Sequence, residues 1–215
     1  MDTIFAEATP PGRGGVSVVR LSGPKARAVL ESLAGPVATP RMAALRALLD
    51  GEDLIDRALV IWFEEGHSFT GEEVAEMHLH GAPVIANRLA QALLARGLRR
   101  AEAGEFSNRA FLNGRMDLAE AEGLADLLSA ETEAQRKLAM RATEGELGRK
   151  ADELRAKLVR AGALIEASID FADEEVPEEV PAEALDLIEA VRSDIRLMLA
   201  GYPATERLRQ GYVVA

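Results

Sequence analysis

Residues 104–118, with the sequence GEFSNRAFLNGRMDL, are the part of this chain best suited to binding a polar group. Its large apolar side chains, among them Phe106, Phe111 and Leu112, are outnumbered by charged and amide groups. The polar members are Glu105, Asn108, Arg109, Asn113, Arg115 and Asp117. A segment with so many hydrogen-bonding groups fills a core poorly, so we expect it to hold something polar. Arg109 and Arg115 would serve either an anion or an acidic neighbour.

Residues 74–80 alternate between apolar and polar side chains, which is typical of a strand. The predicted core face carries Ala75, Met77 and Leu79, and the opposite face carries Val74, Glu76, His78 and His80. A carboxylate among polar neighbours can accept two parallel hydrogen bonds, from an amino-pyrimidine or from a guanidinium. Glu76 is therefore either a ligand-binding carboxylate or part of a solvent-exposed strand face.

Arg20 is the only charged residue in VSVVRLS, residues 16–22. It would either pair with a ligand carboxylate or mark the point where the strand reaches water. His78 and His80 have the spacing of a metal-binding pair. The chain has only one other histidine and no cysteine, so we predict no metal site.

Several other kinds of site are not indicated. The GRGG segment at residues 12–15 lacks the lysine and hydroxyl of a Walker loop and predicts a tight turn instead. No G-x-S-x-G elbow is present, which argues against a hydrolase triad. Aromatic residues make up 4% of the chain, which is low for a base-stacking RNA platform.

The composition fits one large or two small globular domains, with 215 residues, 48% of them hydrophobic and 28% charged. No apolar run is long enough for a membrane span, and the first residues do not resemble a secretory signal. The absence of cysteine excludes disulfides and thiolate chemistry and is compatible with a reducing cytoplasm. The net charge is −11. Residues 1–118 hold 13 basic and 15 acidic groups, and residues 119–215 hold 12 and 21, so the second part should repel nucleic acid.

The elements that position these residues fall into two parts. Residues 1–118 predict a mixed α/β arrangement, with strands at 3–9, 16–21, 43–49, 54–63 and 74–80 and helices at 24–33 and 83–95. Residues 119–215 predict two or three long helices and an acidic, proline-containing loop at 171–181. Asp117 with Glu120, and Thr132 with Gln135, have the spacing of capping boxes.

In the second part, a helical pattern runs from about residue 132 to 169, with Gly145 and Gly148 as kink points, and a last helix covers 182–207. So few helices leave apolar stripes uncovered, because a bundle usually needs four. Either further chain or a second subunit covers these stripes, or the helices pack across the α/β part.

Four segments in order resemble the N-terminal part of the bacterial tRNA-modification GTPases called MnmE or TrmE. These are ATPPGRGGVSVVRLSG, SFTGEEVAEMHLHG, GEFSNRAFLNGRMDLAEAEGLADLL and IDFADEEV. The resemblance covers essentially the whole chain. It implies an α+β fold in which residues 1–118 form a tetrahydrofolate-binding and dimerisation domain. This domain would be similar to the folate domain of glycine-cleavage aminomethyltransferases. Residues 119–215 would form the first part of a helical domain.

The resemblance also implies the site and the partners. By motif position, the family's folate-binding residues fall on Arg20, Glu76 and Arg115, where many members have lysine in place of Arg115. The ligand would be 5-formyl- or 5,10-methylene-tetrahydrofolate. A homodimer in the cytoplasm would act with a flavoprotein of the MnmG or GidA family. The complex would install an aminomethyl-type group at C5 of the wobble uridine of certain tRNAs.

In the family, GTP, Mg²⁺ and K⁺ bind to a GTPase domain, of which GYVVA at the end of this sequence resembles the first strand. We therefore expect a fragment that does not hydrolyse GTP by itself. Two alternatives are a stand-alone folate-dependent one-carbon transferase and a non-catalytic assembly module.

Overall fold

The computed structural model describes residues 2–170 and 181–210. The chain divides into two compact units, Met1–Met116 and Asp117–Ala215. No helix in the described residues is both long enough and apolar enough to cross a membrane.

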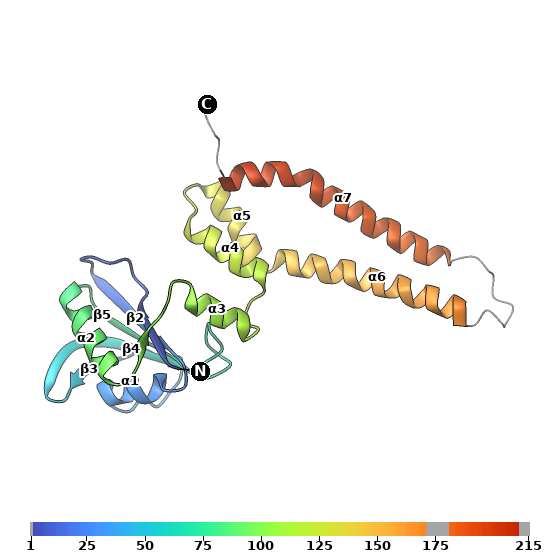
Figure 1. Ribbon diagram of the computed structural model, residues 1–215. Helices are drawn as coiled ribbons and strands as arrows, with labels where there is room; N and C mark the ends of the chain where they lie inside the picture. Colours follow the sequence, from blue (N-terminus) through green and yellow to red (C-terminus); the bar gives the residue numbers. More distant parts are fainter. Residues whose placement is uncertain (1, 171–180, 211–215) are drawn as a thin grey trace. The chain divides into compact units, whose positions relative to one another are not determined.

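The first unit is built on a six-stranded mixed sheet (Figure 1). The strands are β1 (Ile4–Glu7), β2 (Val16–Ser22), β3 (Ala44–Asp50), β4 (Asp53–Phe63), β5 (Val74–His80) and β6 (Arg99–Arg100), in the order β3-β4-β5-β2-β1-β6. Neighbouring strands are antiparallel except β1 and β6, which are parallel. All five predicted strands are present, whereas the short β6 was not predicted.

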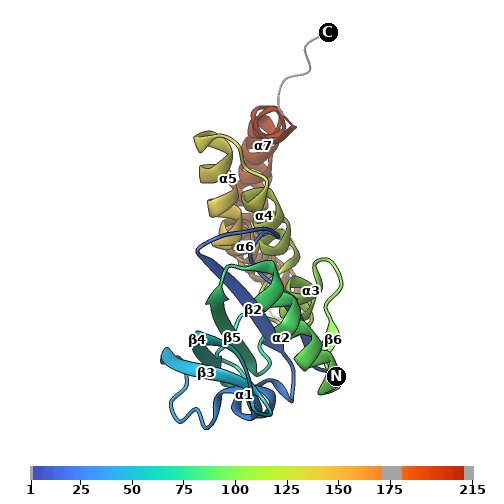
Figure 2. The ribbon, with the colours of Figure 1, turned by 90° about the vertical axis from the view of Figure 1, so that its left-hand side faces the viewer.

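Two helices pack on one face of this sheet, α1 (Ala26–Ala34) and α2 (Pro83–Ala95) (Figure 2). The buried side chains alternate along the strands, so that Val19, Leu21, Met77 and Leu79 join the helices in one core. The predicted core face of β5 is thus confirmed. Pro83 occupies the first turn of α2, where a missing N–H costs nothing, which also confirms the predicted start of that helix.

The opposite face of the sheet is closed at one end and open at the other. Ile4, Ser22 and Val74 are buried at the closed end of this face. Glu76, on the same face of β5 as Val74, is half-buried. Residues 64–73, between β4 and β5, cover the end of this face that carries Ser22. They contact β2 through Ser22 and the helix α3 (Glu105–Leu112) through Arg109. The open end of the face therefore presents the polar side chains of β2 and β5.

The second unit consists, in its described residues, of four helices: α4 (Leu118–Leu128), α5 (Glu133–Thr143), α6 (Glu146–Asp170) and α7 (Ala182–Gln210). Both predicted capping boxes are present, with Asp117 and Glu120 at the start of α4 and Thr132 and Gln135 at the start of α5. Each cap satisfies backbone N–H groups that the first helical turn leaves free.

The helical pattern predicted from 132 to 169 forms two helices, α5 and α6, and not one helix with kinks. The break lies at Gly145, so a kink at that position was the wrong prediction. Gly145 has a φ of 74°, which ends α5 and starts α6, because this left-handed conformation does not continue a helix. Gly148 lies inside α6. The predicted acidic loop at 171–181, apart from Pro181, and the terminal GYVVA segment fall outside the described residues.

Helices α6 and α7 lie side by side as an antiparallel pair (Figure 1). Lys150 and Lys157 of α6 both bind Asp194 of α7, and Arg160 binds Glu183. Much of the apolar surface of both helices is exposed. The exposed large apolar residues include Leu158, Val159, Ile169, Leu185, Ile188, Ile195, Leu197 and Leu199. Within the described residues the uncovered apolar stripe predicted from the sequence is therefore present.

Candidate functional site

Arg20 and Glu76 form a cross-strand ion pair on the open face of the sheet. The two residues are directly opposite each other in the β2–β5 register. Arg20 Nε and Nη2 both lie 2.8 Å from Glu76 Oε1, and the side chain of Glu76 is only 14% exposed. The register follows from the core face, because Val19 and Met77 must be buried and their neighbours then point the other way.

His78 completes a polar row with this pair. Its Nε2 lies 3.2 Å from Glu76 Oε2. Both oxygens of Glu76 thus have a partner, and a carboxylate has about four lone-pair positions. The contact with His78 is the longer one, and His78 is half-buried beside open solvent. A ligand N–H donor would therefore reach Glu76 most readily at Oε2, by replacing His78, because Oε1 already accepts from Arg20.

Apolar side chains flank this polar row. Ile61 and Leu59 of β4 are opposite Glu76 and His78 in the register, and Leu59 is exposed. On the other side the ring of Phe69 lies with its centroid 5.9 Å from the guanidinium carbon of Arg20. A carboxylate beside a cation, bordered by flat apolar surface, suits a planar heterocycle with polar edges.

A hydrogen-bonded loop, residues Ser68–Glu72, carries Phe69. Ser22 Oγ lies 2.6 Å from Thr70 Oγ1 and donates to Glu72 Oε2 at 2.6 Å. Asn113 Nδ2 donates to the backbone oxygen of Thr70 at 2.7 Å. The loop is thereby joined to strand β2 on one side and to the segment after α3 on the other.

Arg115 packs against this loop. Gly71 has a φ of +80°, and a Cβ there would lie 3.1 Å from Arg115 Cγ and 3.2 Å from Asn113 Cβ. In the described residues the Arg115 guanidinium is exposed and has no acidic partner. The structure thus brings Arg20 and Glu76 into contact with each other. Arg115 lies against Gly71, in the same loop as Phe69, which contacts Arg20.

Arg109 of α3 is buried against Glu72 of this loop, and its side chain is only 6% exposed. Its Nη1 donates to Glu72 Oε2 at 3.1 Å and to the backbone oxygen of Asp2 at 2.9 Å, and its Nη2 donates to Glu105 Oε1 at 3.0 Å. Burial lowers the pKa of the Arg109 guanidinium, but hydrogen bonds to Glu105 and Glu72 outweigh it, and the pKa ends above its ordinary value. Of the two roles predicted for Arg109, the structure shows the acidic neighbours.

Arg99 of β6 belongs to the same cluster, because it binds Glu105 of α3 and Asp2 of the N-terminal segment. Its hydrogen bond to Glu105 is the main cause that lowers the pKa of that carboxyl to about 2. Its hydrogen bond to Asp2 likewise lowers the pKa of Asp2 to about 2. These carboxylates therefore remain charged to well below neutral pH.

His80 and His78 have different partners, so they do not form a metal-binding pair. His80 Nδ1 lies 2.7 Å from Asp56 Oδ1, and the His80 backbone N–H donates to Asp56 Oδ2. Burial raises the pKa of Asp56, but these bonds outweigh it and leave the pKa below its ordinary value. Within the described residues no group of three or more side chains is arranged to hold a metal ion.

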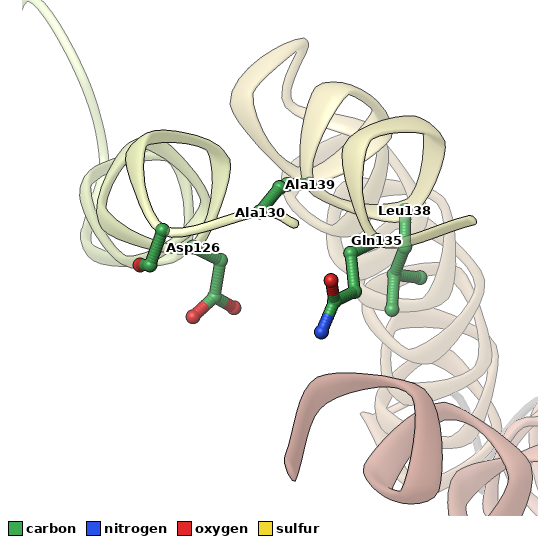
Figure 3. Close-up of a pocket in the computed structure, with 6 residues that line it drawn as sticks. Asp126, Ala130, Gln135, Leu138 and Ala139 are labelled. Carbon is green, nitrogen blue, oxygen red and sulfur yellow. The ribbon is translucent and has the colours of Figure 1, made fainter. Parts of the chain in front are cut away.

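The hollows of the surface differ in size. One of about 460 Å³ borders the Ser68–Glu72 loop and is lined by Pro24, Glu65, Gly71, Glu72, Glu73 and Asn113. Figure 3 shows another, between α4 and α5, lined by Asp126, Ala130, Gln135, Leu138 and Ala139 among others. Its volume of about 60 Å³ fits at most a water or two, since small-molecule pockets span about 300–1,000 Å³.

Sequence reasoning identified Arg20 and Glu76 as unusual, but it did not identify Phe69 or Glu72 as parts of this site. Phe69 is the only aromatic residue between the fourth and fifth strands, which is a weak signal. Nothing in the sequence distinguishes Glu72 from the adjacent Glu73.

Comparison with known proteins shows the family of this chain. Residues 3–115 match a family model described as the N-terminus of GTP-binding protein TrmE, and residues 118–213 match one described as the MnmE helical domain. The chain belongs to the TrmE/MnmE family. The predicted membership and the α+β fold with a following helical region are thereby confirmed.

Curated relatives agree with this family. A tRNA modification GTPase MnmE of Paracoccus denitrificans is 91% identical over 215 residues, which cover all of this chain and 51% of that protein. Proteins of the same name from Roseobacter denitrificans and Phenylobacterium zucineum are 51% and 46% identical over the whole chain. The chain spans about half the length of the curated relatives it matches.

Proposed function

We propose that the first unit of this chain binds a reduced folate as part of a tRNA-modification GTPase. The observation that carries the proposal is the carboxylate of Glu76, mostly buried between Arg20 and His78 on a sheet face bordered by apolar side chains. The proposed contact residues are Arg20, Glu76 and Arg115. The ligand is 5-formyl- or 5,10-methylene-tetrahydrofolate.

The chemistry of these residues fits the ligand. The amino-pyrimidine edge of a pterin offers two parallel N–H donors, which a carboxylate accepts in bidentate fashion. Glu76 would provide this acceptor, with Arg20 keeping it charged and oriented through its two short contacts. Arg115, exposed and without an acidic partner in the described residues, is available for a folate carboxylate or ring carbonyl. Folate, when bound, supplies a one-carbon unit.

The wider role follows from the relatives' name, tRNA modification GTPase. The unit would hold the one-carbon donor while GTP, Mg²⁺ and K⁺ bind elsewhere in the longer protein. With a flavoprotein of the MnmG or GidA family, the cytoplasmic complex would modify C5 of the wobble uridine.

The first unit also has a surface suited to a homodimer. Strand β3 is one of the two outer strands of the sheet. Leu45 on β3 and Leu59 on β4 are 63% and 46% exposed and directly opposite in the register. An outer strand with exposed apolar side chains favours pairing with another chain. Sedimentation of the 215-residue chain should show a dimer that Leu45→Glu weakens, whereas Leu94→Glu on α2 should not. A strict monomer at high concentration would contradict the dimer.

Calorimetric titration with 5-formyltetrahydrofolate tests the folate proposal. We expect heat of binding and a raised unfolding midpoint with the wild-type chain, because a ligand that binds the native state stabilises it. Glu76→Ala should weaken binding at least about 100-fold, since hydrogen bonds to a charged group contribute about 1.5–3 kcal/mol each.

A matched control is Glu52→Ala, in the exposed turn between β3 and β4, which should bind folate as the wild type does. Fluorescence of Trp62, the single tryptophan and buried in the first unit, reports whether each variant is folded. Absence of folate binding by the folded wild-type chain would refute the proposed function. Unchanged affinity in Glu76→Ala would remove Glu76 from the site.

A further inference from the structure

We propose that Arg109 is a positioning residue of the folate site, an inference that rests on the folate-binding function proposed above. Arg109 acts through Glu72 and the Ser68–Glu72 loop. It fixes the places of Phe69 and Arg115 relative to Arg20.

The groups around the ligand differ in how they are held. Arg20 and Glu76 lie on adjacent central strands, and the backbone ladder between β2 and β5 fixes their separation. Phe69 lies in a loop between strands, and Arg115 lies in the irregular segment after α3. Those two groups need contacts outside the ladder to hold their positions.

The backbone of residues 64–73 provides little of this support. Its described backbone hydrogen bonds within the loop are local: His67 N to Glu64 O, Gly66 N to Gly71 O, and Gly71 N to Ser68 O. The backbone bond to the rest of the unit is at its end, from Gly23 N to Glu73 O. Side chains therefore anchor the middle of the loop.

Glu72 is the main anchor. Its carboxylate, whose side chain is 12% exposed, accepts hydrogen bonds from Arg109 Nη1 through both oxygens, at 3.2 Å and 3.1 Å. The same carboxylate accepts from Ser22 Oγ, which also contacts Thr70 Oγ1. Without Arg109, the negative charge of Glu72 would be buried with only neutral donors, an arrangement that is strongly unfavourable unless the loop moves to expose it.

The anchored loop carries one wall of the proposed site, Phe69, and supports one of its proposed ligand contacts, Arg115. Phe69 adjoins Thr70 and lies over Arg20, and Gly71 adjoins Glu72 and packs on the aliphatic part of Arg115. Any shift of the Thr70–Glu72 backbone therefore moves the aromatic wall away from Arg20 and removes the support of Arg115. The hydrogen bonds described for the Arg109 side chain are to Asp2, Glu72 and Glu105, and the bond to Glu72 is the one that connects it to this loop.

The test compares two carboxylates that share the same guanidinium. Glu72→Gln breaks the charged link between Arg109 and the loop. Glu105→Gln removes another partner of Arg109, of similar burial at 14% exposed, but Glu105 lies on α3 and its hydrogen bonds do not involve the loop. Both variants remove one largely buried charge from the same cluster. Glu105 also accepts hydrogen bonds from Arg99, so Glu105→Gln should lose at least as much unfolding free energy as Glu72→Gln.

The readouts are the Kd of 5-formyltetrahydrofolate by calorimetry, the urea midpoint from Trp62 fluorescence, and amide hydrogen exchange of residues 66–72. We expect Glu72→Gln to raise the Kd about tenfold, because the apparent affinity falls with the fraction of molecules whose loop is in the binding position. Faster exchange should be confined to the loop. Glu105→Gln should keep the Kd within about twofold of the wild type despite an equal or larger drop in the urea midpoint.

Asn113→Ala provides a second variant, because it removes another side-chain anchor of the loop, the bond to Thr70 O, without leaving a buried charge. It should also raise the Kd and speed exchange in the loop. Equal Kd values for wild type, Glu72→Gln and Asn113→Ala would overturn the positioning role while leaving folate binding intact. Equal losses of affinity in Glu72→Gln and Glu105→Gln would also overturn it, because they would show general destabilisation. If the wild-type chain itself bound no folate, both proposals would fail.

Discussion

Replacing Gly123 with alanine should destabilise the second unit, although the same replacement inside a helix is usually favourable. Gly123 lies in α4, where alanine would improve helix propensity by about 1 kcal/mol. A Cβ at this position would lie 2.6 Å from Ala142 Cβ and 2.8 Å from the backbone nitrogen of Thr143. Because these atoms belong to α5, the two helices would have to separate.

The magnitude follows from two opposing effects. Overpacking of a close contact costs about 1–3 kcal/mol, against the gain of about 1 kcal/mol in propensity. The contact with backbone cannot relax by rotating a side chain, so we expect the upper part of that range and a net loss of about 1–2 kcal/mol. At a urea dependence of about 2 kcal/mol per molar, the midpoint should fall by roughly 0.5–1 M.

Gly162→Ala is the matched control. Gly162 lies within α6 and is exposed, and a Cβ added there would meet no atom within 4 Å outside its own helix. The same chemical change should therefore raise the free energy of unfolding by about 0.5–1 kcal/mol. The two substitutions are predicted to have opposite signs.

Urea unfolding with two probes measures this. Circular dichroism at the helix band follows all helices, whereas fluorescence of Trp62 follows the first unit alone. The dichroism transition should move to lower urea in Gly123→Ala and to higher urea in Gly162→Ala, with no change in fluorescence midpoint. If Gly123→Ala stabilised the chain as much as Gly162→Ala, the close packing of α4 on α5 would be refuted.

Three further predictions concern the first unit. Asp2 and Glu105 have pKa values lowered to about 2, so their stabilisation is complete above the unfolded-state values near 4 and should be lost as pH falls from about 5 to 2, measured by thermal midpoints at each pH; a flat profile over this range would contradict these ion pairs. Gly81→Ala should cost about 1–3 kcal/mol, seen as a lower urea midpoint of Trp62 fluorescence, because its Cβ would collide with the backbone oxygen of Gly14; an unchanged midpoint would show that the loop before β2 moves freely. Arg109→Gln should cost about 3–5 kcal/mol by the same assay, since it leaves Glu72 buried without its cation, and a loss under about 1 kcal/mol would contradict that burial.

Local chemistry in the sequence predicted many of the elements. The capping boxes at Asp117 and Thr132 involve residues three apart, so their hydrogen bonds depend on one helical turn alone. The alternation in residues 74–80 predicted which side chains of β5 enter the core. Gly145 was identified as a special position, but not as a helix end, because a glycine pattern does not state its φ.

Tertiary structure decided which of the singled-out polar groups meet. Arg20 and Glu76 are 56 residues apart in the sequence, and their contact exists because β2 pairs with β5 in one register. Arg109 was one polar residue among several in its segment. Its burial follows from contacts with Asp2, 107 residues away, and with Glu72.

The sequence by itself determined the family, the two kinds of architecture and the strand faces, because these depend on residue types at short, regular spacing. Only the tertiary structure decided that residues 104–118 supply both a buried arginine that anchors the loop, Arg109, and an exposed one, Arg115. The physical reason is that the environment of a charge is set by neighbours distant in sequence. Carboxylates from other parts of the chain compensate the buried charge of Arg109, whereas Arg115, which has no acidic partner in the described residues, stays in water.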